Sequence, residues 1–353
     1  MLPRAADADM MPVLFGTDRA VEARSGRLDF SAERAEKLSL GRALIQVPRR
    51  YRTADRDRPW AVSRLHHKAS APVGGVVASA DDTHFAVYDI KALSHDEFLQ
   101  AAVTRLAVSR RYKDHALVFV HGFNTTFETA LYRAAQVAYD LRFDGAPFVY
   151  SWPSAGRVPR YSYDSDSARQ AGPHLAGFLR VVIAATGAKS ISVIAHGLGA
   201  GPVLDALVAL KGEIPAGVAL REIILVAPDV DRPAFEARIH ELSGTARHIT
   251  LYTAASDRGL NISRRFTGGV PRAGDVLEGG PLVLGGVDTV DASIPGTDAI
   301  GRNHAGYVEA GALVADIAAR LGAETGAPTG LEPVASATGA YWRFPAEKSK
   351  SQR

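Results

Sequence analysis

The chain has 353 residues, no cysteine and a formal net charge of only +3, with 46% apolar and 22% charged residues. These values are typical of an ordinary globular protein with one large domain or two smaller ones. They exclude disulfides, thiolate metal sites and a cysteine nucleophile. Because the basic residues are scattered rather than clustered, no nucleic-acid partner is expected.

The ends and the hydropathy of the chain give a coarse expectation about location. The first eleven residues are polar and acidic, and no apolar run approaches the roughly 20 residues of a membrane span. We therefore expect a cytoplasmic protein without a membrane span, while a leader removed earlier stays open. The oligomeric state is not readable from the sequence.

Three short strands are predicted at residues 12–16, 40–47 and 84–90, separated by connections rich in Arg, Asp, Pro and Gly. Ser94 and Glu97 then have the spacing of a capping box, which predicts the start of a helix. Thr125 and Glu128 have the same spacing and predict a second helix start.

From residue 115 onward, strands and helices alternate. Strands are predicted at 116–120, 148–152, 191–195, 222–226, 248–252 and 287–290, and a long helix at 165–185, where Pro173 should kink or delay the start. A final helix is predicted at 312–321. This alternation predicts an α/β fold with a doubly wound, mostly parallel sheet and helices on both faces.

We divide the chain accordingly into three parts. Residues 1–90 are expected to extend the sheet with β structure, and residues 91–322 to form the α/β core. Residues 323–353 are rich in Gly, Pro, Ala and Thr and are expected to be a flexible tail, although Tyr341, Trp342 and Phe344 could dock locally.

The segment around Gly197 has the pattern of a nucleophile elbow. Residues 190–200 read Ser-Ile-Ser-Val-Ile-Ala-His-Gly-Leu-Gly-Ala, an apolar strand that runs into a glycine-rich turn and a helix. In G-x-S-x-G elbows the central residue is the nucleophilic serine, and the residue after it donates an N–H to the oxyanion. Here Gly197 stands at the serine position and Leu198 at the donor position. Glycine-rich turns also bind phosphates, but the spacing of a nucleotide site is absent.

Other polar residues follow predicted strands at the same edge of the sheet, where reactive groups collect in doubly wound folds. Gly122 permits a sharp turn that would direct the Phe123 N–H toward an oxyanion; the alternative is an ordinary strand-to-helix turn in which His121 is a structural histidine. His304 lies between the last predicted strand and the last helix, after two aspartates, in the chain order nucleophile, acid, base. Asp257 and Asp229 both qualify as the acid that orients the imidazole; we favour Asp257, although either could simply cap a helix.

Several of these segments together resemble a known family. They are residues 12–19, 119–124, 150–153, 163–168, 194–199, 227–229, 256–258 and 303–304, and they look like the bacterial α/β-hydrolases grouped as DUF900, an esterase/lipase-like family. The resemblance implies the α/β-hydrolase fold and hydrolysis of a small-molecule carboxylic ester by Ser, His and Asp, without a metal or organic cofactor. By matching position, the serine falls on Gly197, the base on His304 and the acid on Asp257 or Asp229.

The side chains expected to contact substrate flank these positions: His121, Asn124, Trp152, Tyr163 and His196. Three interpretations of Gly197 stay open. The chain is an esterase from which the nucleophile has been removed, a natural pseudo-hydrolase that binds a ligand or partner, or an enzyme in which His304 activates a water directly.

Overall fold

The computed structural model describes residues 9–24, 27–48, 85–255, 257–293, 311–322 and 330–345. Most strands belong to one sheet of eleven. Its members are β1 (Asp9–Arg24), β2 (Arg27–Val47), β3 (Ala86–Leu93), β4 (His115–Val120), β5 (Ala146–Ser151), β6 (Ser190–His196), β7 (Ala219–Val226), β8 (Ala246–Thr253), β11 (Asp288–Asp291), β12 (Glu332–Ser336) and β13 (Gly339–Arg343). A two-stranded ribbon pairs β9 (Val276–Leu277) with β10 (Gly280–Pro281).

The strand order is β12-β13-β11-β8-β7-β6-β4-β5-β1-β2-β3. Within this sheet, pairing is parallel from β1 through β5, β4, β6, β7, β8 and β11 to β13. It is antiparallel among β1, β2 and β3 at one edge and between β12 and β13 at the other. Strand β4 continues toward one edge through β5 and toward the other through β6, so the sheet is doubly wound. The predicted fold class is therefore confirmed.

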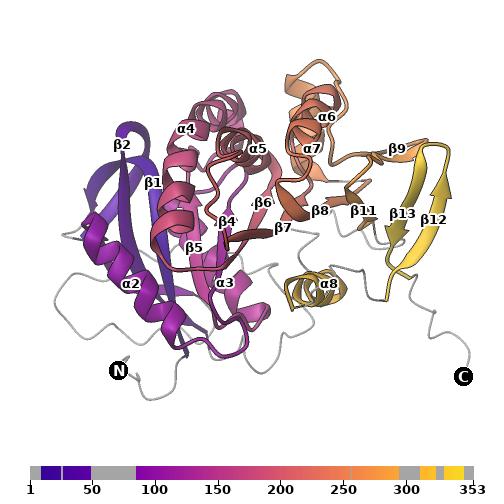
Figure 1. The fold of residues 1–353 in the computed structure, drawn as a ribbon. Helices are drawn as coiled ribbons and strands as arrows, with labels where there is room; N and C mark the ends of the chain where they lie inside the picture. The colour runs from indigo at the N-terminus through magenta and orange to yellow at the C-terminus, as the bar shows by residue number, and fades with distance from the viewer. Residues whose placement is uncertain are drawn as a thin grey trace, which may run out of the picture.

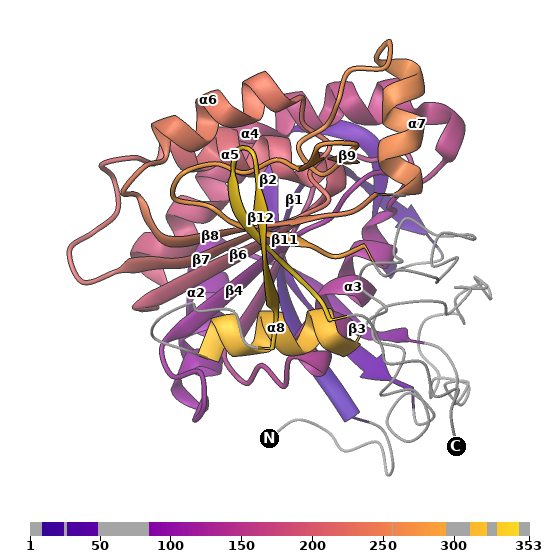
Figure 2. The same ribbon diagram turned by 90° about the vertical axis from the view of Figure 1, so that its right-hand side faces the viewer.

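Helices cover both faces of the sheet (Figures 1 and 2). They are α2 (His95–Ala107), α3 (Phe127–Asp140), α4 (Tyr161–Ala185), α5 (Ala200–Ala209), α6 (Arg232–Glu241), α7 (Arg258–Phe266) and α8 (Gly311–Gly322). Figure 2 shows α4, α5 and α6 on one side of the strands and α3 and α8 on the other. Within the described ranges, no helix has both the length and the hydropathy needed to cross a membrane.

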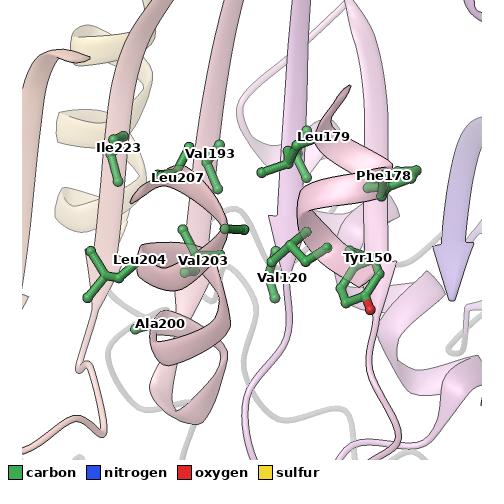
Figure 3. Close-up of a cluster of buried hydrophobic side chains, with 14 of the residues drawn as sticks. Val120, Tyr150, Phe178, Leu179, Val193, Ala200, Val203, Leu204, Leu207 and Ile223 are labelled. Carbon is green, nitrogen blue, oxygen red and sulfur yellow. The ribbon is translucent and has the colours of Figure 1, made fainter. Parts of the chain in front are cut away.

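The central strands are apolar on both faces, as buried parallel strands must be. Every residue of β4 and β5 is buried. Figure 3 shows side chains of α4 and α5, including Leu179 and Val203, lying against Val120 and Val193 of the sheet. This packing fixes the carboxyl ends of β4 and β6, from which the loops at Phe123 and Gly197 leave.

Two helix starts test the capping predictions. Ser94 accepts the Glu97 N–H and the Glu97 carboxylate accepts the Ser94 N–H, which confirms that capping box. The second prediction was wrong by one residue, because Thr126 caps α3 and accepts the Thr129 N–H. The hydroxyl of Thr125 turns inward and donates to the Phe123 carbonyl oxygen instead.

The long helix α4 begins at Tyr161, four residues earlier than expected, and carries Pro173 inside it. The described part of the C-terminal segment also differs from the expected flexible tail. Strands β12 and β13 form an antiparallel hairpin that pairs in parallel with β11 through Val290 and Trp342. Phe344 is buried after the hairpin, so aromatic residues in a Gly- and Ala-rich segment stabilise an edge ribbon. The division at residues 90 and 322 stays a prediction.

A buried polar cluster lies between α8 and the sheet. The carboxylate of Glu222 accepts a hydrogen bond from the Thr250 hydroxyl at 2.6 Å. The Arg320 guanidinium donates to Asp316 at 2.9 Å, to Thr250 at 3.0 Å and to Asp288 at 3.1 Å. Burial raises the pKa of Glu222 to about 7, although the Thr250 hydrogen bond and Arg320 act in the opposite direction.

Replacing this carboxyl by an amide, Glu222→Gln, is expected to flatten the pH dependence of stability. The folded pKa of about 7 exceeds the ordinary value of 4.5, so the folded state binds this proton more tightly than the unfolded chain does. Stability therefore falls as the pH rises between these two values, by up to about 3 kcal/mol. Urea unfolding should show equal stability near pH 4.5 and a more stable variant at about pH 8.5.

The matched control is Glu236→Gln, at an exposed position on α6 whose carboxylate lies outside this cluster. It should follow the parent protein at both pH values. A Glu222→Gln variant that is less stable than the parent at the higher pH would contradict the raised pKa of Glu222.

Candidate active site

The turn after β6 has the backbone geometry of a nucleophile elbow. Strand β6 ends at His196, the short helix η2 spans Gly197–Gly199, and α5 follows at Ala200. Gly197 has φ of +53°, in the left-handed region that most residues avoid. Nucleophile elbows hold their reactive residue in such a strained conformation between a strand and a helix. The backbone that would present a hydroxyl is therefore present, and the residue on it is glycine.

The elbow and the turn after β4 touch each other through glycines. A Cβ atom on Gly199 would lie 2.3 Å from the His121 carbonyl oxygen. A Cβ on Gly122 would lie 2.9 Å from the His196 carbonyl oxygen and 2.8 Å from its Nδ1. Neither position tolerates a side chain without movement of backbone. The contact places Phe123, the next residue of the β4 turn, beside the elbow.

Two N–H groups near Gly197 are the expected oxyanion donors. Leu198 lies in the first turn of η2, which continues into α5, and the N–H groups of a first helical turn have no acceptor within the helix. The Phe123 N–H donates no hydrogen bond to any of the residues that the structure describes. Both amides keep the capacity to bind an oxyanion, and the positive end of the helix dipole adds to it.

The Asp164 carboxylate holds the residues that follow Phe123. It accepts hydrogen bonds from the Asn124 N–H at 3.1 Å, the Ser154 hydroxyl at 2.6 Å and the Ala155 N–H at 2.7 Å. The Ser154 hydroxyl oxygen in turn accepts the Thr125 N–H at 2.9 Å. The loops after β4 and β5 are thereby tied to the first turn of α4. Burial raises the pKa of Asp164, while the Ala155 and Ser154 hydrogen bonds oppose that rise.

Arg19, on β1, also donates hydrogen bonds to the loops after β4 and β5. Its side chain is 1% exposed. It donates to the Ser151 hydroxyl at 2.9 Å and to three carbonyl oxygens, those of Ser154 at 2.9 Å, Thr125 at 2.8 Å and Ser31 at 3.2 Å. Burial lowers its pKa to about 10, which leaves the guanidinium charged at neutral pH.

His121 and Trp152, both expected to contact substrate, are enclosed by the protein. Their rings stack with centroids 4.8 Å apart, and the Trp152 indole N–H donates to the His121 carbonyl oxygen at 2.8 Å. Burial, with a further contribution from Arg19, lowers the pKa of His121 to about 3, so its imidazole is neutral. Their exposed fractions are 1% and 0%, which argues against direct substrate contact and for a supporting role.

The other three expected substrate contacts are more accessible. Asn124 is exposed and has φ of +57°, which asparagine tolerates better than most residues. Tyr163 is half-buried; its hydroxyl donates to the Ala32 carbonyl oxygen at 2.6 Å, and the guanidinium groups of Arg34 and Arg160 lie over its ring. His196 is half-buried beside Gly122.

Asp229 lies beside the elbow in a buried network. Its N–H donates to the Gly197 carbonyl oxygen at 3.0 Å. One carboxylate oxygen accepts from the Ser263 hydroxyl at 2.5 Å and pairs with Arg272 Nε at 3.1 Å, and the other accepts from the Tyr161 hydroxyl at 2.8 Å. The Tyr161 ring also packs edge-on against Phe123, with centroids 5.2 Å apart. Sequence reasoning missed Tyr161, Ser263 and Arg272, because no short motif links them to Asp229.

Asp257 follows β8 and caps α7. One of its carboxylate oxygens accepts the Leu260 N–H at 2.8 Å, and the residue is buried. The cap of α6 is Asp231 rather than Asp229, so the capping alternative applies to Asp257 and not to Asp229. His304, the expected base, lies outside the described residues. Among those that are described, no cluster of His, Asp or Glu could hold a metal ion.

The family model described as alpha/beta hydrolase of unknown function, DUF900, matches residues 95–320. The chain belongs to this family. A comparison with curated proteins finds no match. The match of this DUF900 chain begins at α2 and ends in α8, so it includes both turns that meet at Gly122 and Gly199, and it excludes β1 with its buried Arg19.

Proposed function

We propose that this DUF900 protein has the site of a carboxylic ester hydrolase of the Ser-His-Asp type, inactivated at the nucleophile position by Gly197. The observation that carries the proposal is the positive φ of Gly197 at the junction of β6 and the following helix, with the Phe123 turn packed directly against it. A plain strand-to-helix connection does not require this left-handed backbone conformation, which would be strained for any residue other than glycine.

In the proposed site each residue has one role. The N–H groups of Leu198 and Phe123 bind the oxyanion of the tetrahedral intermediate. His304 transfers the proton, and an aspartate orients its imidazole and stabilises the imidazolium. We favour Asp257, because Asp229 already pairs with the Arg272 guanidinium, and a carboxylate neutralised in this way stabilises an imidazolium less.

The choice of acid is tested in the background of Gly197→Ser. There, Asp257→Asn is expected to lower kcat for an ester by about 10²–10⁴-fold, because the imidazole loses its orienting charge. Asp229→Asn should chiefly lower the melting temperature, since it breaks the network with Tyr161, Ser263 and Arg272. Reversed results in the two assays would transfer the role of the acid to Asp229.

A second function follows from the same glycine. The turn from His196 to Gly199 contains no hydroxyl or thiol, so a natural pseudo-hydrolase that binds a ligand or partner in the old cleft is the alternative. Turnover of p-nitrophenyl butyrate by the unaltered chain and by Gly197→Ser distinguishes the three interpretations of Gly197. Ester turnover that appears only with serine supports the inactivated esterase. No gain of turnover with serine supports the binding module. Turnover by the glycine form that depends on His304 supports direct attack by water.

A further inference from the structure

Exposed apolar side chains lie in two segments beside the candidate active site. Phe266, the last residue of α7, is 56% exposed, and Val270 in the following loop is 42% exposed. Val158, which begins the short helix η1 (Val158–Arg160) directly before α4, is 46% exposed. We call these three residues the apolar patch. Figure 2 shows α7 beside one end of α4, and the two helices are in contact.

An aromatic series leads from the apolar patch to the turn after β4. The rings of Phe266 and Tyr161 stack, with centroids 5.3 Å apart and planes 17° apart. The Tyr161 ring packs edge-on against Phe123, with centroids 5.2 Å apart. Tyr161 and Phe123 are buried, so the outer ring alone offers a large free surface. The series begins at the residue whose N–H is the proposed oxyanion donor and ends in solvent at Phe266.

Hydrogen bonds fix α7 relative to the elbow. Ser263, three residues before Phe266, donates to the Asp229 carboxylate at 2.5 Å, and the Tyr161 hydroxyl donates to the same carboxylate at 2.8 Å. The Asp229 N–H donates to the Gly197 carbonyl oxygen at 3.0 Å. The position of the Phe266 ring is therefore set by the same network that holds the turn at Gly197.

We propose that Phe266 binds the acyl chain of the ester and makes this site selective for chains of medium length over short ones. The proposal rests on the ester hydrolase assignment of the elbow. An acyl chain is the occupant that the aromatic series favours, because its polar end belongs at the Phe123 N–H and its apolar end needs an apolar surface. Contact with the chain removes apolar area of Phe266 from water.

The spacing of the rings determines which chain lengths gain from this contact. Each step of the series is about 5 Å, so a short acyl group held at the Phe123 N–H ends at the first ring, whereas an eight-carbon chain reaches Phe266. Full burial of one methylene group strengthens binding by about fourfold. Since one ring covers only one side of a chain, we expect about tenfold in total for the four additional methylene groups of octanoate over butyrate.

The first test measures binding to the unaltered chain, so that it does not depend on catalysis. Ligand-observed NMR titration should give a Kd for methyl octanoate about tenfold lower than that for methyl butyrate. Phe266→Ala should remove this difference by weakening octanoate binding, while the Kd for butyrate stays within about twofold. Phe266→Leu keeps an apolar side chain at this position and should retain most of the preference.

The matched control is Tyr88→Ala, which removes another exposed aromatic ring, on the edge strand β3. It should leave both Kd values unchanged. Equal affinity of the unaltered chain for the two esters, or equal effects of Tyr88→Ala and Phe266→Ala, would overturn the proposal. Unchanged ester binding by Phe266→Ala would overturn it too; if that variant also turned a dimer into a monomer in sedimentation, the apolar patch would instead be an interface between two copies of this chain.

The second test uses the Gly197→Ser background and separates this proposal from the hydrolase assignment. There, kcat/KM for p-nitrophenyl octanoate should exceed that for the butyrate by about tenfold, and adding Phe266→Ala should abolish the preference through KM with little change in kcat. Turnover without any chain-length preference would overturn the acyl-chain proposal and leave the hydrolase assignment standing. Absence of turnover, with octanoate binding that still depends on Phe266, would refute the hydrolase assignment and support the acyl-chain site.

Discussion

Replacing Gly197 with serine is expected to raise kcat/KM for p-nitrophenyl butyrate by at least about 10³-fold. The hydroxyl would stand on a backbone that already has φ of +53°, next to the amides of Leu198 and Phe123. In triad enzymes the nucleophile and base act as a unit, so restoring the one missing member recovers most of the rate. The strain of an L-residue at this φ lowers stability by roughly 1–2 kcal/mol, which a modest fall in melting temperature should report.

The control for this prediction is Gly197→Ala, which adds the same Cβ and the same strain without a hydroxyl. It should lose stability like the serine variant and gain no activity. A burst of p-nitrophenol equal to the enzyme concentration would identify an acyl-enzyme in the serine variant, and adding His304→Ala should remove it. If the serine variant is folded and binds ester but gives neither burst nor turnover, the proposed hydrolase site is wrong.

Removing the buried guanidinium with Arg19→Met is expected to lower the free energy of unfolding by about 3–5 kcal/mol. The methionine would leave the carbonyl oxygens of Thr125, Ser154 and Ser31 without the donor that Arg19 supplies. A buried acceptor without a donor is destabilising by its full desolvation penalty, and here the loss falls on several acceptors at once.

Urea unfolding at neutral pH measures this loss, and Arg42→Met on the neighbouring strand β2 is the matched control. Arg42 pairs with Asp89 at an exposed position, so its loss should change stability by less than about 1 kcal/mol. A similar small change in Arg19→Met would show that the loops after β4 and β5 do not depend on β1 for their position.

The parts of this molecule that the sequence predicted well are those set by local pattern. The central strands are continuous apolar runs, so β4 through β8 were placed to within three residues, and the elbow was visible because strand, glycine turn and helix are contiguous. The Ser94 capping box lies within four residues. At this range the side-chain types themselves determine the backbone.

The parts that escaped prediction depend on contacts between distant segments. Tyr161 meets Asp229 across 68 positions of the chain and Ser263 meets it across 34, and neither spacing has a signature. Arginine is normally exposed, so nothing in the sequence distinguished the buried Arg19 from the many exposed arginines. The hairpin of β12 and β13 was missed because its composition is that of a loop, and its pairing with β11 is a tertiary contact.

The close approach of Gly122 to His196 and of Gly199 to His121 has a consequence for which substitutions these two turns tolerate. A methyl group at Gly122 or at Gly199 would collide with the backbone of the neighbouring turn, so a substitution at either position is expected to destabilise both turns. Loss of a reactive hydroxyl at Gly197 carries no such penalty, since glycine relaxes the backbone there. If Gly197 replaced a nucleophilic serine, as proposed, these steric requirements would preserve the surrounding backbone without any activity, and the single change Gly197→Ser would return the hydroxyl to it.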